Sequence, residues 1–189
     1  MKIQLTGDSL MARNEGLTEP AINEALRNRI NDLEIVNTAV CGENSGALLE
    51  RIDSEILAVE KAQKIFIIIG TNDLATNKRV FADQYAKNLQ SIIMRLIEKY
   101  DRNNVFFLSI PPIDEDKQRY RSNLLINEYN RVLKEVCLRN NCHYLLFNER
   151  LNQFEPKELL DILEGSMDDG LHFGLKGYQI MADLISEEL

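Results

Sequence analysis

A run of five apolar residues, Ile65-Phe66-Ile67-Ile68-Ile69, constrains the fold of this chain more than any other feature. Such a run has no polar side to turn toward water, so it is typical of a parallel strand covered by helices on both faces of its sheet. A second run, Val105-Phe106-Phe107-Leu108, has the same character. Two strands of this kind predict a parallel sheet at the centre of an α/β fold.

Segments of helical periodicity separate the strand-like runs. One apolar stripe runs along residues 80–100 and consists of Tyr85, Leu89, Ile92, Ile93, Leu96 and Ile97. Strands are predicted over Lys2–Thr6, Leu33–Thr38, Lys64–Ile69, Asn104–Ile110 and His143–Phe147. Helices are predicted over Glu19–Ile30, Ser45–Ala62, Val80–Tyr100, Arg121–Asn140, Pro156–Leu163 and Leu175–Glu188. This order predicts a five-stranded parallel sheet with helices on both faces, joined by right-handed crossovers, in one domain over residues 1–189.

The charge balance and the hydropathy pattern exclude several classes of function. With 22 basic and 30 acidic residues the chain carries a formal charge of −8, and an acidic surface repels nucleic acid and anionic membranes. The chain has no long apolar run without charged residues, so no membrane-spanning segment is predicted. Met1–Thr6 lacks the pattern of a signal peptide. We therefore expect no nucleic-acid partner, no stable membrane association and a cytoplasmic location.

The cysteines and histidines argue against a disulfide framework and against a metal site. Cys41, Cys137 and Cys142 are an odd number without disulfide-like spacing, and free thiols fit a reducing compartment. The chain has only two histidines and no Cys-x-x-Cys pair, which is too few ligands for zinc. We expect neither a metal nor a cofactor.

Three candidate ligand-binding residues follow three different strands. In a parallel sheet, the loops after the strands meet at one edge, where ligands bind. Ser9 follows the first strand in Gly7-Asp8-Ser9-Leu10, and Asn72 follows the third in Gly70-Thr71-Asn72-Asp73. Gly42, after the second strand, offers an amide that a ligand can approach closely. Each of these residues, taken alone, also fits an ordinary turn or a helix N-cap.

The two histidines differ in where the expected topology places them. His172 lies before the last helix, three residues after Asp169, so the carboxylate can reach the near imidazole nitrogen and leave the far one to accept a proton. His143 opens a strand at the opposite end of the sheet and is predicted to be structural. Acyl transfer needs a nucleophile, a base, an orienting carboxylate and oxyanion donors, and the sequence offers a candidate for each.

These sequence blocks resemble those of the SGNH hydrolases, a family named after a Ser, a Gly, an Asn and a His. The blocks of the family, in order, are similar to residues 7–10, Asn37 with Gly42, residues 70–73 and residues 169–172. The family has a flavodoxin-like fold, so the resemblance implies a three-layer α/β/α sandwich.

The resemblance also implies a role for each candidate residue. It implies Ser9 as nucleophile, His172 as general base and Asp169 as the carboxylate that orients the base. It further implies an oxyanion hole formed by the amides of Ser9 and Gly42 and by the side chain of Asn72. The departures from the family pattern are Ala39, Glu43-Asn44 and Met11-Ala12-Arg13. These residues flank the reacting groups, so they affect the shape of the substrate more than the reaction.

The expected function is hydrolysis of small or short-chain acyl esters through an acyl-enzyme. The long loop after the fourth strand, residues 111–120, is mostly charged, so as a lid it offers little apolar contact to a long acyl chain. A thioesterase, a lysophospholipase or a carbohydrate O-deacetylase would use the same residues, and a non-catalytic binding domain is the alternative from another class. A nucleotide-binding domain is disfavoured, because Gly7-Asp8-Ser9 is not a Gly-rich phosphate loop. The oligomeric state is not predicted.

Overall fold

The computed structural model describes all 189 residues and contains one sheet of five parallel strands in the order β2-β1-β3-β4-β5. The strands are β1 (Lys2–Gly7), β2 (Glu34–Asn37), β3 (Lys64–Ile68), β4 (Val105–Leu108) and β5 (His143–Leu145). From β1 the chain first moves outward to β2 and then returns to the other side of β1 as β3. The strand order therefore reverses at the carboxyl ends of β1 and β3, where an α/β sheet opens a crevice for ligands.

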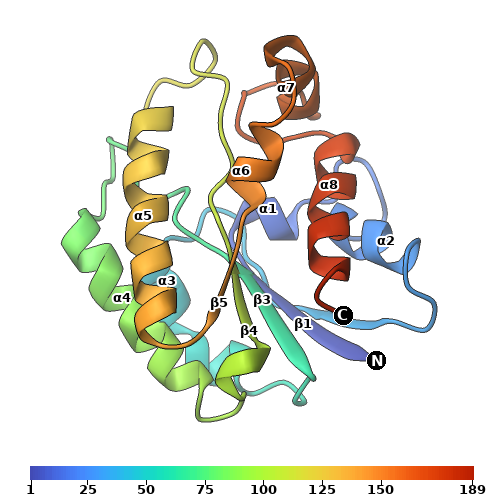
Figure 1. The fold of residues 1–189 in the computed structure, drawn as a ribbon, viewed down its shortest axis with the longest axis vertical. Coiled ribbons are helices and arrows are strands. Elements are labelled where there is room, and N and C mark those ends of the chain that lie inside the picture. Colours follow the sequence, from blue (N-terminus) through green and yellow to red (C-terminus); the bar gives the residue numbers. More distant parts are fainter.

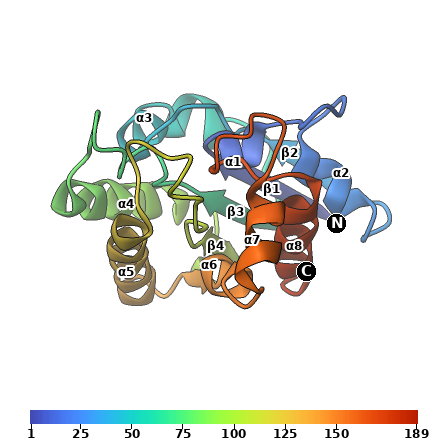
Figure 2. The ribbon, with the colours of Figure 1, turned by 90° about the horizontal axis from the view of Figure 1, so that it is seen from above.

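Helices cover both faces of this sheet (Figures 1 and 2). One face carries α2 (Ala21–Arg27), α6 (Phe147–Leu151), α7 (Pro156–Leu163) and α8 (Leu175–Ser186). The other face carries α3 (Ser45–Glu50), α4 (Ala82–Leu96) and α5 (Asn123–Arg139). A short helix of one turn, α1 (Ser9–Ala12), follows β1 directly. The predicted three-layer α/β/α arrangement with a five-stranded parallel sheet is confirmed.

The apolar strands fill two cores, one on each face of the sheet. Phe66 and Ile68 of β3 pack in the core under α2 and α8, whereas Ile65 and Ile67 pack in the core under α4 and α5. All four side chains are fully buried. Successive side chains of a strand point to opposite faces, so a strand between two helical layers is apolar at every position.

The predicted helix over Ser45–Ala62 is wrong in its second half. The α-helix ends at Glu50, a π-helical turn follows over Ile52–Ile56, and no regular helix continues to Ala62. Distant side chains bind the carbonyl groups that a helix would use. The side chain of Gln4 donates to the carbonyl of Ile56 (2.9 Å), and Lys99 donates to the carbonyls of Leu57 and Val59. Tertiary contacts therefore satisfy these carbonyl groups without a continuing helix.

Smaller differences concern the ends of elements. The strands predicted over Leu33–Thr38, Asn104–Ile110 and His143–Phe147 are shorter at one or both ends, and Phe147 begins the unpredicted helix α6. The helices predicted over Glu19–Ile30, Val80–Tyr100, Arg121–Asn140 and Leu175–Glu188 are likewise trimmed, whereas α7 has the predicted bounds. No helix combines the length and the apolar character needed to cross a membrane.

Candidate active site

Ser9 lies at the carboxyl end of β1, and the two preceding residues, Gly7 and Asp8, fix its position. Gly7 has a φ of +135°, and a Cβ at this position would lie 1.9 Å from the carbonyl oxygen of Ile68 on the neighbouring strand. Only glycine allows this close approach. Asp8 then caps α1 by accepting a hydrogen bond from the Leu10 amide (2.9 Å). Ser9 is the first residue of α1, so its own amide has no acceptor within the helix.

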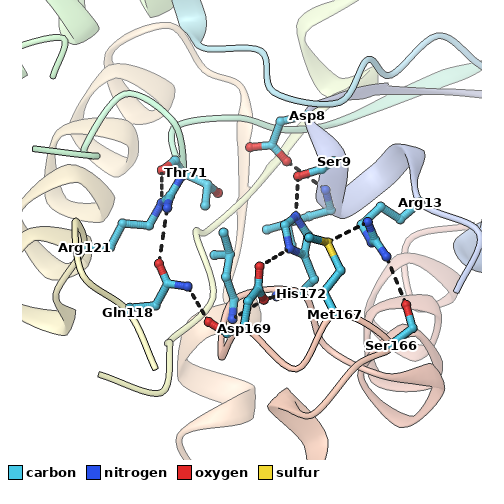
Figure 3. Close-up of polar contacts among 12 residues, drawn as sticks. Asp8, Ser9, Arg13, Thr71, Gln118, Arg121, Ser166, Met167, Asp169 and His172 are labelled. Carbon is cyan, nitrogen blue, oxygen red and sulfur yellow. Dashed lines mark hydrogen bonds and ion pairs between the residues drawn. The ribbon is translucent and has the colours of Figure 1, made fainter. Parts of the chain in front are cut away.

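The structure brings Ser9, His172 and Asp169 together in one line of hydrogen bonds (Figure 3). Ser9 Oγ lies 2.8 Å from His172 Nε2, and His172 Nδ1 lies 2.8 Å from Asp169 Oδ2. A carboxylate can only accept, so Nδ1 carries the ring proton of a neutral His172. The Ser9 hydroxyl therefore donates to Nε2, which is the arrangement required of a general base.

The Asp169 carboxylate is oriented by its own loop. Its Oδ1 atom accepts hydrogen bonds from the backbone amides of Leu171 (3.0 Å) and His172 (2.9 Å), which leaves Oδ2 for the imidazole. Partial burial acts to raise the pKa of Asp169, but the hydrogen bonds from His172 and Leu171 outweigh it and hold this pKa below its usual value. Asp169 is therefore ionised at neutral pH and able to stabilise a charged imidazolium.

Two other carboxyl groups near the site behave differently. Burial raises the pKa of Asp8 to about 7, although the Leu10 amide acts in the opposite direction. Burial also raises the pKa of Asp73 to about 6, against hydrogen bonds from Ser45. Both carboxyl groups thus hold a proton more readily than Asp169 does, so Asp169 is the most readily ionised of these three groups.

Asn72 and the loop that contains Gly42 are joined directly. Asn72 Nδ2 donates to the backbone carbonyl of Glu43 at 2.8 Å, so the residue after Gly42 is bound to the amide group of Asn72. Gly42 has a φ of +83°, which favours glycine over other residues. Asn72 is 6% exposed and Ser9 8% exposed, so both side chains lie just below the surface. The two predicted oxyanion elements after β2 and β3 are therefore adjacent.

A buried polar cluster behind these loops was not predicted from the sequence. Asp73 accepts hydrogen bonds from the amide (2.9 Å to Oδ2) and from the hydroxyl of Ser45, and Asn88 donates to the Ser45 hydroxyl at 2.8 Å. These contacts fasten the start of α3 to the loop after β3. Only the position of Asp73 next to Asn72 pointed to this role, because Ser45 and Asn88 lie far away in the sequence.

Arg121 and Gln118 also belong to the site and were not predicted to do so. Arg121 donates to the Thr71 carbonyl (Nε, 2.8 Å), to Asn72 Oδ1 (Nη2, 3.1 Å) and to Gln118 Oε1 (Nη1, 3.2 Å). Gln118 in turn donates to the backbone carbonyl of Asp169 (Figure 3). The loop after β4 thus contacts both the Asn72 loop and the Asp169 loop. No sequence motif signalled these contacts.

His143 lies outside this group of residues, as the sequence predicted. It is the first residue of β5, and its ring stacks on Phe106 with centroids 4.4 Å apart. The site contains no group of three or more His, Cys, Asp or Glu side chains arranged to hold a metal ion. All three cysteines are free thiols, with Cys41 exposed and Cys137 and Cys142 buried.

Solved structures with the same fold include several ester hydrolases. A lipase/acylhydrolase from Enterococcus faecalis superposes with a TM-score of 0.84 at 24% identity, covering 99% of this chain and 94% of the other. An acetyl xylan esterase superposes with a TM-score of 0.79 at 18% identity over the whole of both chains. The acetylxylan esterase of Geobacillus stearothermophilus gives 0.72 at 18% identity, covering 99% and 93%.

One curated relative is a much longer protein, and it is named as a transferase. The chain is 29% identical over 161 residues to the N-acylneuraminate cytidylyltransferase of Escherichia coli. The match covers 84% of this chain but spans only 36% of the length of that relative.

A sequence model of one family covers most of the chain. The GDSL-like lipase/acylhydrolase family matches residues 5–180, a range that includes Ser9, Gly42, Asn72, Asp169 and His172. The fold, the order of the sequence blocks and this match agree with one another. The chain belongs to the GDSL-like lipase/acylhydrolase family.

Proposed function

We propose that this enzyme hydrolyses small acyl esters through a Ser9-His172-Asp169 triad and an acyl-enzyme intermediate. The single observation that carries the proposal is the unbroken line of 2.8 Å contacts from Ser9 Oγ through the imidazole to Asp169. A serine hydroxyl is a weak nucleophile until a neighbouring base removes its proton. His172 is in hydrogen-bonding position to do so, and Asp169 holds its ring in the required tautomer.

In the proposed mechanism Ser9 Oγ attacks the ester carbonyl carbon while its proton moves to His172 Nε2. The negative charge that forms on the carbonyl oxygen is stabilised by the amides of Ser9 and Gly42 and by Asn72 Nδ2. His172 then gives its proton to the departing alkoxide, which leaves as the alcohol. Water repeats the attack on the acyl-enzyme with His172 again as base, and the acid is released as Ser9 regains its proton.

The preferred acyl group is proposed to be short. The long loop after β4, residues 111–120, is mostly charged, so it offers little apolar contact to a long acyl chain. An acetyl or butyryl group needs less of this contact than a long chain does. The acetyl xylan esterases among the structural relatives favour the same conclusion and make a carbohydrate O-acetyl ester the leading natural candidate. The absence of a nucleic-acid partner and a cytoplasmic location stay predictions from the sequence.

A fluorophosphonate probe tests the proposed nucleophile. The probe should label the enzyme once, and peptide mass spectrometry should locate the adduct on Ser9. Ser9→Ala should abolish labelling, whereas substitution of the exposed Ser54 by alanine should leave it unchanged. An adduct on another serine of the active enzyme would refute the assignment of Ser9.

The chain-length preference is tested with p-nitrophenyl esters from acetate to palmitate, each below its micellar concentration. We expect kcat/KM to be highest for acetate or butyrate and to fall for longer chains. A long apolar groove would add about 0.8 kcal/mol of binding for each buried methylene, which is roughly fourfold in kcat/KM. A value that rises steadily to palmitate would therefore reveal such a groove and contradict the proposed short-chain preference.

A further inference from the structure

Arg121 is a half-buried arginine that has no ion-pair partner, although it lies at the active site. Arginines of comparable burial, Arg13 and Arg51, are paired with carboxylates of glutamate. Arg121 instead directs three of its five N–H groups at neutral oxygens, those of Thr71, Asn72 and Gln118. Removing the guanidinium of Arg121 from water without a carboxylate partner costs free energy. The position of this cation at the edge of the sheet therefore suggests a functional role.

The contact with Arg121 acts together with the Glu43 carbonyl to fix the orientation of the Asn72 amide. The oxygen and nitrogen of an asparagine side chain are nearly equal in size, so sterics alone leave two orientations open. A guanidinium can only donate, so the oxygen of Asn72 must face Arg121. The nitrogen must then face the Glu43 carbonyl, where it uses one N–H. The second N–H is left for the oxyanion.

The positive charge of Arg121 adds to this effect. Burial lowers the pKa of Arg121, and the carboxylates of Asp8 and Asp169 act to raise it. A guanidinium remains charged at neutral pH even so. A cation at the oxygen end of an amide polarises the N–H bonds at the other end, which strengthens their hydrogen bonds to an anion.

The same loop also contacts the triad. Gln118, held by Arg121, donates to the backbone carbonyl of Asp169 (Figure 3). Residues 118–121 therefore connect the Asn72 loop with the Asp169 loop, two segments nearly one hundred residues apart in the sequence.

We propose that Arg121 is a positioning residue, which holds the amide of Asn72 with its nitrogen toward the oxyanion. This inference rests on the proposed function of Asn72 as an oxyanion donor. It assigns Arg121 no direct contact with the substrate.

A double-mutant cycle with short-chain ester as substrate tests the proposal. Arg121→Ala should lower kcat by about 10- to 100-fold with KM changed less than about twofold, because the affected charge exists only in the transition state. Adding Asn72→Ala to Arg121→Ala should cost far less than Asn72→Ala costs in the wild-type enzyme, because both changes disable the same donor. Arg121→Lys keeps the charge and a donor group but loses the planar fork of the guanidinium, so it should recover part of the lost kcat.

Arg119 provides the matched control. It lies two residues away in the same exposed loop, and its guanidinium stacks over the ring of Tyr120. Arg119→Ala should keep wild-type kcat and KM. Circular dichroism and thermal unfolding of every variant check the fold, and Arg121→Lys carries the test if Arg121→Ala does not fold.

Two outcomes would overturn the proposal. Fully additive losses in the cycle would show that Arg121 acts independently of Asn72. A loss confined to KM would show that Arg121 binds the substrate itself. A wild-type enzyme that neither turns over esters nor reacts with a fluorophosphonate would instead refute the proposed function, so the two failures are distinguishable.

Discussion

Replacing His172 with alanine is expected to lower kcat by about 10⁴- to 10⁶-fold, because the proposed general base for Ser9 is then absent. His172 Nε2 is the atom within hydrogen-bonding distance of Ser9 Oγ, at 2.8 Å. The substitution removes a buried side chain whose hydrogen bonds are all within the site, so the fold should persist. Single-turnover and steady-state assays with p-nitrophenyl acetate, together with circular dichroism, measure both effects.

The second histidine supplies the control for this experiment. His143→Ala removes a ring that stacks on Phe106 at the start of β5, away from the reacting groups. It should reduce thermal stability slightly and leave kcat near the wild-type value. Comparable losses of activity in both variants, with the fold intact, would mean that the general base has been assigned wrongly.

Asn72→Ala carries the second largest expected effect, a loss of about 100- to 1000-fold in kcat. One oxyanion donor contributes about 3–4 kcal/mol to the transition state, and KM should change little because the charge is absent from the bound ester. Asn72 also holds the Glu43 carbonyl, so its removal frees the neighbouring Gly42 loop as well and favours the upper end of this range.

The exposed residue Asn127 on α5 offers a matched substitution for comparison. Asn127→Ala removes the same chemical group from the surface and should leave both kcat and KM unchanged. If Asn72→Ala raised KM and left kcat intact, Asn72 would be a substrate-binding residue and not an oxyanion donor.

The parts of the fold that the sequence predicted are those with local signals. Ile65–Ile69 is apolar at every position, so a central strand was the natural interpretation. The motif residues could be placed because Ser9 and Asn72 follow strands closely, because His172 lies just before the last helix, and because the order of the blocks resembles a known family. The helix over Ser45–Ala62 was predicted too long, since nothing near Ile56 reveals that Gln4 binds its carbonyl group.

The unpredicted part of the site depends on contacts between distant segments. Arg121 was assigned only to the start of a helix, and its partners Thr71 and Asn72 lie about fifty residues earlier in the chain. The raised pKa of Asp8 has a similar origin, because the burial that causes it comes from segments remote in sequence. Periodicity and motif spacing describe neighbours along the chain, so they do not detect such contacts.

The contact between Ser9 and His172 joins residues that are 163 positions apart, and α8, which follows His172, packs beside α2. Closing a long loop costs chain entropy before any new contact compensates for it, so we expect this contact to form after the local helices. A chain in which the segment around His172 has not docked would lack the proposed general base. We expect such chains to be inert toward esters, so that hydrolytic activity reports the final docking of the two remote segments of the chain.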